Sequence, residues 1–152
     1  MSRGEAVILI AEADDGLAEL IIRNLKSAGL MNRVVRFKNG GEVLDYLVGH
    51  GNGGDGPPIG SFVLLLDNRL PVVDGVEVLR RVKASQRLRR MPVIMLTTDS
   101  DPQGIQWWQD IGCNCCVTKP ADSERFAEVL TALGRFLGLA EVPYLPPVGE
   151  PH

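Results

Sequence analysis

Four apolar runs of this sequence end in polar residues that could bind a metal ion and a phosphoryl group. In chain order these residues are Glu12, with Asp14 close behind, then Asp67, Thr97 and Lys119. Clustered carboxylates repel one another, and a hard divalent cation such as Mg²⁺ removes this conflict by taking their oxygens as ligands. The cation would neutralise a phosphoryl group, while the lysine ammonium and the threonine hydroxyl contact its remaining oxygens. The residue types therefore suit phosphoryl transfer assisted by Mg²⁺.

These residues meet only if the apolar runs form neighbouring strands of one sheet. The runs cover residues 6–11, 34–37, 62–66, 92–96 and 115–118. Short apolar runs rich in β-branched residues are typical of strands that are buried on both faces. Segments with helical spacing alternate with them, so we expect an α/β fold, a doubly wound five-stranded parallel sheet flanked by five helices. Such sheets bind ligands at the carboxyl ends of their strands, where the polar residues stand.

Capping residues mark the expected helices. The helices cover residues 16–28, a segment after Asn39, a segment after Asp74, a segment that begins at Asp101-Pro102, and residues 123–137. Gly29 is well placed to end the first helix. Asn39 with Glu42, and Asp74 with Glu77, have the spacing of a capping box.

Each polar residue also has a structural explanation that competes with the chemical one. Acids at strand ends often cap helices, and a lysine before a proline can simply be exposed. One such residue alone would be a weak signal, but their ordered combination across four strands favours a functional site.

Length and charge are those of an ordinary globular protein. The chain has 152 residues, which suits one domain, and a formal net charge of −3, which gives no electrostatic reason to expect nucleic acid as a partner. No apolar stretch approaches the roughly 20 residues that span a bilayer, and the N-terminus lacks a signal-peptide pattern, so we expect a cytoplasmic protein without a membrane partner. We expect a domain over residues 1–138. Residues 139–152 should be a proline-rich tail without regular structure, although Val142, Tyr144 and Leu145 could dock on a surface.

The three cysteines lie together as Cys113, Cys115 and Cys116. Their odd number and the lack of a second cluster argue against a disulfide framework. Cys113 and Cys116 have CxxC spacing, but a tetrahedral zinc site needs two more ligands, and both histidines are far away in the sequence. We therefore expect the thiols to have a structural role.

Over residues 5–138 the sequence resembles the response-regulator receiver family. The similarity rests on the segments LLLDNRLPVVDG (64–75), VIMLTT (93–98) and VTKP (117–120). The resemblance implies a flavodoxin-like receiver fold in which Asp67 is the phosphoacceptor, Thr97 the switch hydroxyl and Lys119 the phosphoryl-binding lysine. It also implies a bound Mg²⁺, with the backbone carbonyl of Arg69 among its ligands.

The resemblance implies a role and partners as well. A protein of this kind is a single-domain response regulator of a two-component phosphorelay. It takes a phosphoryl group from a histidine kinase and signals by altered protein contacts, with at most slow autodephosphorylation as an enzymatic activity. Long variants with an apolar tail look similar to regulators that partner phytochrome-type histidine kinases. The peptide bond between Lys119 and Pro120 is usually cis in the family.

Ala13 departs from the family pattern, because the family has the second of two adjacent acids at this position. The expected metal ligands here are therefore Glu12, Asp14, Asp67 and the Arg69 carbonyl, with Asp14 as the substitute acid if the loop turns differently. Since one carboxylate fewer faces the ion, we expect weaker Mg²⁺ binding than is usual in the family.

Cys116 is a second departure, because the family usually has an aromatic residue three positions before the lysine. An aromatic rotamer switch cannot operate with a cysteine at this position. Redox sensing at Cys116 is disfavoured, because a buried thiol near an acidic site should be poorly ionised.

Trp107 and Trp108 lie together in the expected fourth helix, and helical spacing directs one inward and leaves the other exposed. An exposed tryptophan is typical of an interface. Our working hypothesis is a homodimer through the face formed by this helix, strand 115–118 and helix 123–137.

Two other classes of protein compete with the phosphorylated receiver. One is a pseudo-receiver, a phosphorylation-independent interaction module, which Ala13 and Cys116 favour. The other is a small flavodoxin-like or hydrolase enzyme, but the sequence lacks a phosphate loop, a GxSxG nucleophile elbow and a candidate catalytic histidine. Uptake of a phosphoryl group by Asp67 separates the phosphorylated receiver from the pseudo-receiver.

Overall fold

A five-stranded parallel sheet forms the centre of the computed structural model, which describes residues 5–49, 57–97 and 102–145. Its strands are β1 (Val7–Ala11), β2 (Val34–Phe37), β3 (Gly60–Asp67), β4 (Val93–Thr97) and β5 (Cys115–Thr118). Their spatial order is β2-β1-β3-β4-β5, and each neighbouring pair is parallel. This arrangement confirms the doubly wound sheet expected from the alternating pattern.

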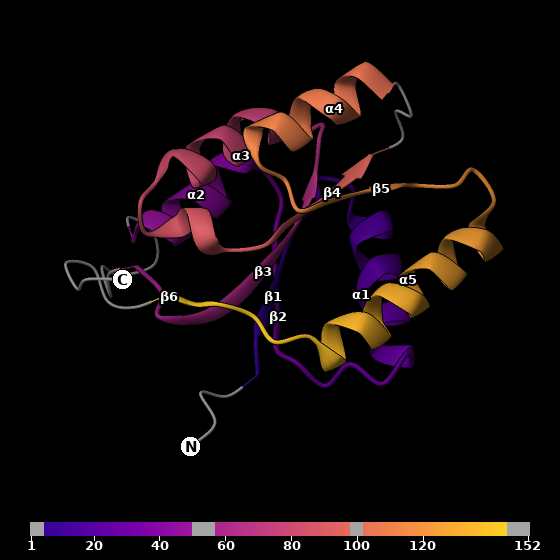
Figure 1. Ribbon diagram of the computed structural model, residues 1–152. Coiled ribbons are helices and arrows are strands. Elements are labelled where there is room, and N and C mark those ends of the chain that lie inside the picture. Colours follow the sequence, from indigo (N-terminus) through magenta and orange to yellow (C-terminus); the bar gives the residue numbers. More distant parts are fainter. Residues whose placement is uncertain (1–4, 50–56, 98–101, 146–152) are drawn as a thin grey trace.

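Helices cover both faces of the sheet (Figure 1). They are α1 (Asp15–Ser27), α2 (Gly40–Val48), α3 (Gly75–Ala84), α4 (Pro102–Ile111) and α5 (Ser123–Leu139), with a short 3₁₀ turn at Leu88–Arg90. Helices α1 and α5 lie together on one face, and α2, α3 and α4 lie on the other. Asp101, the expected start of α4, is outside the described residues.

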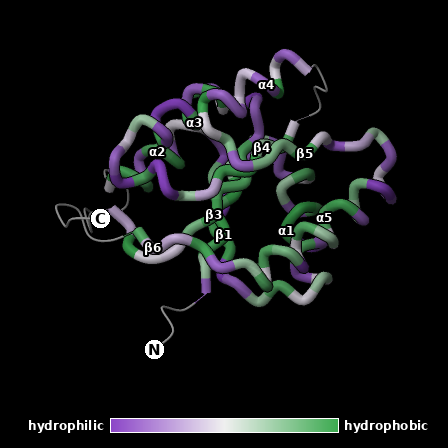
Figure 2. The backbone as a smooth tube through the Cα atoms, in the orientation of Figure 1, coloured by the Kyte–Doolittle hydropathy of each residue, from purple (hydrophilic) through white to green (hydrophobic). Residues whose placement is uncertain are grey.

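Two apolar cores hold these layers together, one on each face of the sheet. Successive residues of β1 serve opposite cores: Ile8 and Ile10 pack with α1 and α5, whereas Leu9 packs with α2 and α3. Figure 2 shows the strands as hydrophobic, with hydrophilic residues on the outer parts of the helices. Burying a large aliphatic side chain of this kind contributes about 1.5–3 kcal/mol, so the central strands are fixed firmly enough to position the polar residues at their carboxyl ends.

The end of α1 and the start of α2 agree with the capping signals in the sequence. Gly29 has φ 96° just after α1, a left-handed conformation that glycine adopts without a steric cost. At α2, Asn39 Oδ1 accepts a hydrogen bond of 2.9 Å from the Glu42 amide, and Glu42 Oε1 accepts one of 3.2 Å from the Lys38 amide.

The prediction of a capping box at α3 was wrong, because the hydrogen bonds of such a box are not formed there. Asp74 stands at the N-cap position but makes no side-chain cap hydrogen bond. Glu77 pairs with Arg80 at 2.9 Å and with Arg81 at 3.0 Å, because arginines three and four positions further along a helix lie on the same face.

The proline-rich tail contains a short strand, contrary to the expectation that it has no regular element. Strand β6 (Tyr144–Leu145) runs antiparallel to the start of β3, opposite Gly60 and Ser61. Ser61 Oγ donates a hydrogen bond of 3.2 Å to the Val142 carbonyl, and Leu145 is fully buried. This part of the tail therefore docks on the sheet, which the sequence analysis had left open. The strand forms because two residues of β3 extend beyond both β1 and β4.

Helix α4 places its two tryptophans as expected. Trp108 is buried, whereas Trp107 is half exposed. The Arg80 guanidinium lies over the Trp107 ring, with 5.8 Å between Arg80 Cζ and the ring centroid. None of the described helices has the length and apolar character needed to cross a membrane.

Candidate functional site

Three of the predicted site residues meet at the carboxyl edge of the sheet. Lys119 Nζ lies 2.9 Å from Asp67 Oδ2 and 3.0 Å from Glu12 Oε1. Glu12 follows β1, Asp67 ends β3 and Lys119 follows β5, so the parallel topology itself brings these strand ends together. All three side chains are buried, which strengthens the attraction between their charges.

Asp67 is held in place by both its backbone and its carboxylate. It belongs to the ladder between β3 and β4, opposite Leu96, so its position depends on two of the most buried strands. Asp67 Oδ1 accepts a hydrogen bond of 2.9 Å from the Arg69 amide, which brings the backbone of the exposed Arg69 next to the carboxylate. One oxygen therefore faces the loop and the other faces Lys119.

Gly75 allows the loop after Asp67 to return to the strand end. A Cβ atom at Gly75 would lie only 2.1 Å from the Asp67 carbonyl oxygen, a distance that no real side chain tolerates. The segment that carries the family resemblance thus contains a glycine required by close packing against the candidate phosphoacceptor.

Thr97 and Lys119 are linked through the backbone. The Lys119 amide donates a hydrogen bond of 2.7 Å to the Thr97 carbonyl, directly after the pairing of Thr97 with Thr118. Thr97 is fully buried at the end of β4, in the strand next to Asp67. Thr98 is outside the described residues.

The pKa of Glu12 is perturbed at this edge of the sheet. Burial raises its pKa above the ordinary value of 4.5, the nearby Asp67 carboxyl raises it further, and the Lys119 ammonium acts in the opposite direction. Two carboxylates share one ammonium here, so the site carries an excess of negative charge when both are ionised.

Asp14 does not join this group in the structure. It is exposed at the N-cap of α1, and its Oδ1 accepts a hydrogen bond of 2.9 Å from the Leu17 amide. Among the described residues there is no cluster of three or more acidic, histidine or cysteine side chains arranged to hold a metal ion. The excess negative charge and oxygen donors of Glu12 and Asp67 nevertheless fit a hard cation such as Mg²⁺.

Arg36 is a site-positioning residue that the sequence analysis missed. Its Nε and Nη2 donate hydrogen bonds of 3.0 and 2.7 Å to the Glu12 carbonyl, and its Nη2 donates another of 3.2 Å to the Ala13 carbonyl. Its Nη1 pairs with Asp15 at 2.7 Å. The single charged residue within the apolar run 34–37 is the signal that could have identified it.

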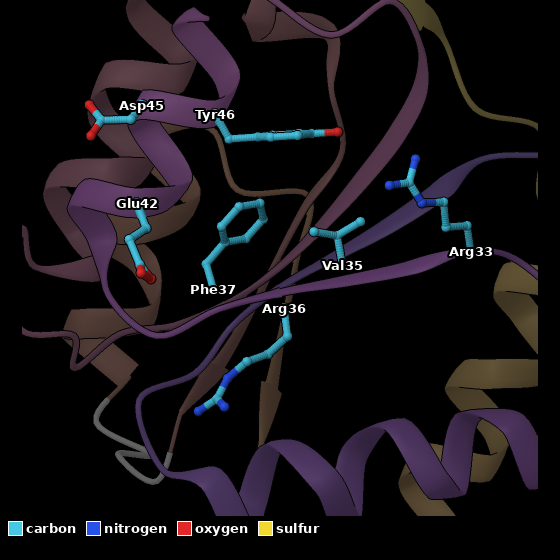
Figure 3. Close-up of a pocket in the computed structure, with 7 residues that line it drawn as sticks. All are labelled: Arg33, Val35, Arg36, Phe37, Glu42, Asp45 and Tyr46. Atoms are coloured by element: carbon cyan, nitrogen blue, oxygen red, sulfur yellow. The ribbon is translucent and has the colours of Figure 1, made fainter. Parts of the chain in front are cut away.

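A cavity of about 440 Å³ lies beside Arg36 along β2 and α2, lined also by Phe37, Glu42 and Tyr46. In Figure 3, Arg36 extends from β2 on the side opposite to Phe37, toward α1. Neither Asp67 nor Lys119 lines this cavity, so it is separate from the charged cluster.

The bond between Lys119 and Pro120 is not cis, contrary to what the resemblance implies. The trans form is the lower-energy isomer of such a bond. Lys119 reaches both carboxylates from this geometry, so the contacts described above do not require the cis form.

Comparison with known proteins identifies the family of the whole domain. The family model described as the response regulator receiver domain matches residues 8–131, which include every strand of the parallel sheet except the first residue of β1. The match therefore includes Glu12, Asp67, Thr97 and Lys119.

Solved structures agree with this match. A response regulator receiver domain from Rhodospirillum rubrum is 35% identical, with a TM-score of 0.84 over 93% of this chain and 99% of that one. The phosphorylated cyanobacterial phytochrome response regulator RcpA is 29% identical, with a TM-score of 0.81 over 92% and 99%. The Mn²⁺-bound form of response regulator Rcp1, a protein of Synechocystis sp., is 26% identical, with a TM-score of 0.82 over 91% and 99%. The chain therefore belongs to the response regulator receiver domain family.

Proposed function

We propose that this protein is a single-domain response regulator that accepts a phosphoryl group from a histidine kinase on Asp67 and signals through altered protein contacts. The observation that carries the proposal is the buried contact of 2.9 Å between Asp67 Oδ2 and the Lys119 ammonium. A cation beside a carboxylate oxygen is what a newly bound phosphoryl group needs for its negative charge.

The transfer step needs little from the protein beyond positioning and charge. A carboxylate oxygen of Asp67 attacks the phosphorus of a phosphohistidine, and the bond from phosphorus to the imidazole nitrogen breaks. The product is an aspartyl phosphate on this chain and a free histidine on the kinase. The Arg69 amide keeps the carboxylate in one orientation, and Lys119 neutralises charge on the phosphoryl oxygens.

Mg²⁺ would be held by Glu12, by Asp67 and by the backbone carbonyl of Arg69, and would supply further charge neutralisation. The Mn²⁺-bound form of the similar protein Rcp1 supports a divalent cation here. Asp14 would have to give up its capping bond to Leu17 before it could serve as a ligand. Since Ala13 offers no carboxylate, the site should bind Mg²⁺ more weakly than sites with an additional acid.

The partners follow from the same similarities and from the surface. Similarity to the phytochrome response regulator RcpA supports a phytochrome-type histidine kinase as the partner. The proposed location is the cytoplasm. The exposed Phe136 of α5 supports a homodimer through α4, β5 and α5, whereas the half-exposed Trp107 of α4 lies beneath Arg80 of α3. In this account residues 1–138 form the receiver and residues 139–152 its tail, without nucleic acid or membrane as a partner.

A pseudo-receiver is the second candidate, because two observations favour it. Lys119 already bonds to both carboxylates in the structure, and Asp14 is engaged in capping α1. A protein of this kind would bind partners without phosphate.

Treatment with acetyl phosphate and excess Mg²⁺, followed by intact-mass measurement, separates these two functions. A phosphorylated receiver gains the mass of one phosphoryl group, and Asp67→Asn loses this gain. Asp74→Asn is the matched control, because Asp74 is exposed and makes no side-chain cap, and it should gain the phosphoryl group as the wild type does. A wild-type chain that gains no mass under any tested Mg²⁺ concentration would favour the pseudo-receiver.

A further inference from the structure

We propose that Cys113 and Cys116 are a redox-active pair that forms a reversible intramolecular disulfide. Their sulfur atoms lie 3.3 Å apart in the structure, in direct contact. From the sequence alone we expected a structural role for these thiols and disfavoured redox sensing at Cys116, because a buried thiol is poorly ionised. The direct contact between the two sulfur atoms, which CxxC spacing alone does not show, is the observation that favours a redox pair. The proposal does not depend on phosphorylation of Asp67.

The backbone around the pair is well defined on both sides. The Cys113 amide donates a hydrogen bond of 3.0 Å to the Trp108 carbonyl at the end of α4. Cys116 belongs to β5, where it pairs with Met95. Gly112 has φ 129°, so a glycine conformation turns the chain between these two elements.

The pair is close to the geometry that a disulfide requires. Bonded sulfur atoms are about 2.0 Å apart, so the two sulfurs must approach by a little more than one ångström. Asn114 lies between the two cysteines, and its Oδ1 accepts a hydrogen bond of 2.9 Å from the Val93 amide and one of 3.3 Å from Lys83. These contacts keep the segment in a conformation that already brings the thiols together.

The environment gives the two thiols different roles. The pKa of Cys113 is raised to about 12, mainly by burial and then by the hydrogen bond with Cys116, while the Lys83 ammonium acts in the opposite direction. Burial also raises the pKa of Cys116, but there the hydrogen bond with Cys113 acts in the opposite direction. Cys113 therefore keeps its proton, and Cys116, which is also less buried, is the thiol that reacts first.

The oxidant that suits this site is a small-molecule disulfide such as oxidised glutathione. The Cys116 thiolate attacks one sulfur of the oxidant, the bond between the two glutathione sulfurs breaks, and one glutathione leaves as a thiolate. Cys113 then gives up its proton and attacks the Cys116 sulfur, and the second glutathione leaves. Overall, two protein thiols are oxidised to one disulfide and the oxidant is reduced to two glutathione thiols.

Cys115 is not part of the pair. Its side chain is exposed, and its sulfur lies 3.9 Å from the Cys116 carbonyl oxygen. Neighbouring residues of a strand point to opposite faces, so Cys115 and Cys116 are directed apart. A Cys113–Cys116 bond would join the turn after α4 to β5, the strand that ends just before Lys119.

The test is a titration of the full chain in glutathione buffers with an increasing oxidised fraction, followed by acid quenching, alkylation of the denatured protein and mass spectrometry. The reduced wild type takes up an alkyl group on each of its three cysteines. In oxidising buffer we expect Cys113 and Cys116 to take up neither an alkyl group nor a glutathione, because the bond between them has removed two hydrogen atoms, in more than about nine tenths of the molecules. Cys115, which is exposed, takes up an alkyl group or a single glutathione. Excess dithiothreitol should restore uptake at all three.

Matched variants identify the partners. Cys115→Ser should still form the bond and take up no alkyl group when oxidised. Cys113→Ser should keep a glutathione on Cys116, because no resolving thiol is present. Wild-type protein that is alkylated or glutathionylated on both Cys113 and Cys116 throughout the titration would overturn the proposal. The wild-type measurement decides this even if a variant fails to fold.

Discussion

Lys119 and Asp67 form a buried ion pair across the carboxyl edge of the sheet, with 2.9 Å between Nζ and Oδ2. The partners are 52 residues apart in sequence, and their side chains are only 7% and 11% exposed. Glu12 adds a second carboxylate to the same ammonium, so these three side chains carry a net negative charge when both carboxylates are ionised. This imbalance has consequences for pH dependence and for metal binding.

Replacing Glu12 with glutamine should change how stability depends on pH. The raised pKa of Glu12 means that its contribution to stability is complete below its ordinary value of 4.5 and is lost as pH rises through the folded-state value. Glu12→Gln stays neutral, so its free energy of unfolding relative to that of the wild type should rise as pH increases from 4.5 through the folded-state pKa of Glu12. Urea unfolding in EDTA over this range measures the difference.

The control for this experiment is Glu128→Gln, which alters an exposed residue of α5 and should keep the wild-type pH profile. A constant difference between Glu12→Gln and the wild type across the pH range would show that Glu12 does not titrate differently in the folded protein.

Replacing Ala13 with aspartate should strengthen Mg²⁺ binding. Ala13 is exposed next to Glu12, so the new side chain has room and adds a carboxylate close to the existing pair. We expect the affinity to rise by about tenfold or more, which corresponds to about 1.4 kcal/mol. Isothermal titration calorimetry with Mg²⁺ measures this, with Ala132→Asp on the exposed side of α5 as the control for added charge. Equal affinities in Ala13→Asp and the wild type would place the metal site elsewhere.

The sequence was sufficient to predict the sheet and the meeting of Glu12, Asp67 and Lys119, because each residue follows a strand and parallel strand ends share one edge. It was not sufficient for contacts that depend on loop paths. Asp14 caps α1, and Arg36 reaches back from β2 to the Glu12 carbonyl. Periodicity does not describe such loop contacts.

The two local errors also arose from contacts that a sequence pattern does not contain. Glu77 had the spacing of a capping residue, but Arg80 and Arg81 compete for it on the helix surface. The tail was expected to be irregular because of its prolines. Tyr144 and Leu145 are not prolines, however, and they pair with the first residues of β3. Composition cannot predict this pairing, which joins segments far apart in the sequence.

Replacing Arg36 with alanine should destabilise the loop that carries Glu12. The change removes charge-assisted hydrogen bonds to the Glu12 and Ala13 carbonyls, which should lower the free energy of unfolding by about 2 kcal/mol. Lys38→Ala is the matched control, because Lys38 pairs with the same Asp15 only across 3.9 Å at an exposed site, and should cost less than about 0.5 kcal/mol. Chemical denaturation measures both. Equal effects would mean that Arg36 acts only as a surface charge.

Replacing Leu145 with alanine should show whether the tail contributes to the stability of the domain. Leu145 is 0% exposed in β6, and removal of a buried leucine side chain should cost about 2–5 kcal/mol. Leu139 is 86% exposed at the end of α5, so Leu139→Ala should change stability by less than about 0.5 kcal/mol. Thermal and urea unfolding test the pair. Similar small effects in both variants would mean that β6 does not contribute to the folded state in solution.

The most direct test of the central claim is to locate the phosphorylated residue chemically. After treatment with acetyl phosphate and Mg²⁺, borohydride converts an aspartyl phosphate into homoserine, and peptide sequencing by mass spectrometry finds the converted position. We predict homoserine at position 67 and an unmodified chain in Asp67→Asn. Conversion at any other acid, with Asp67 left intact, would contradict it.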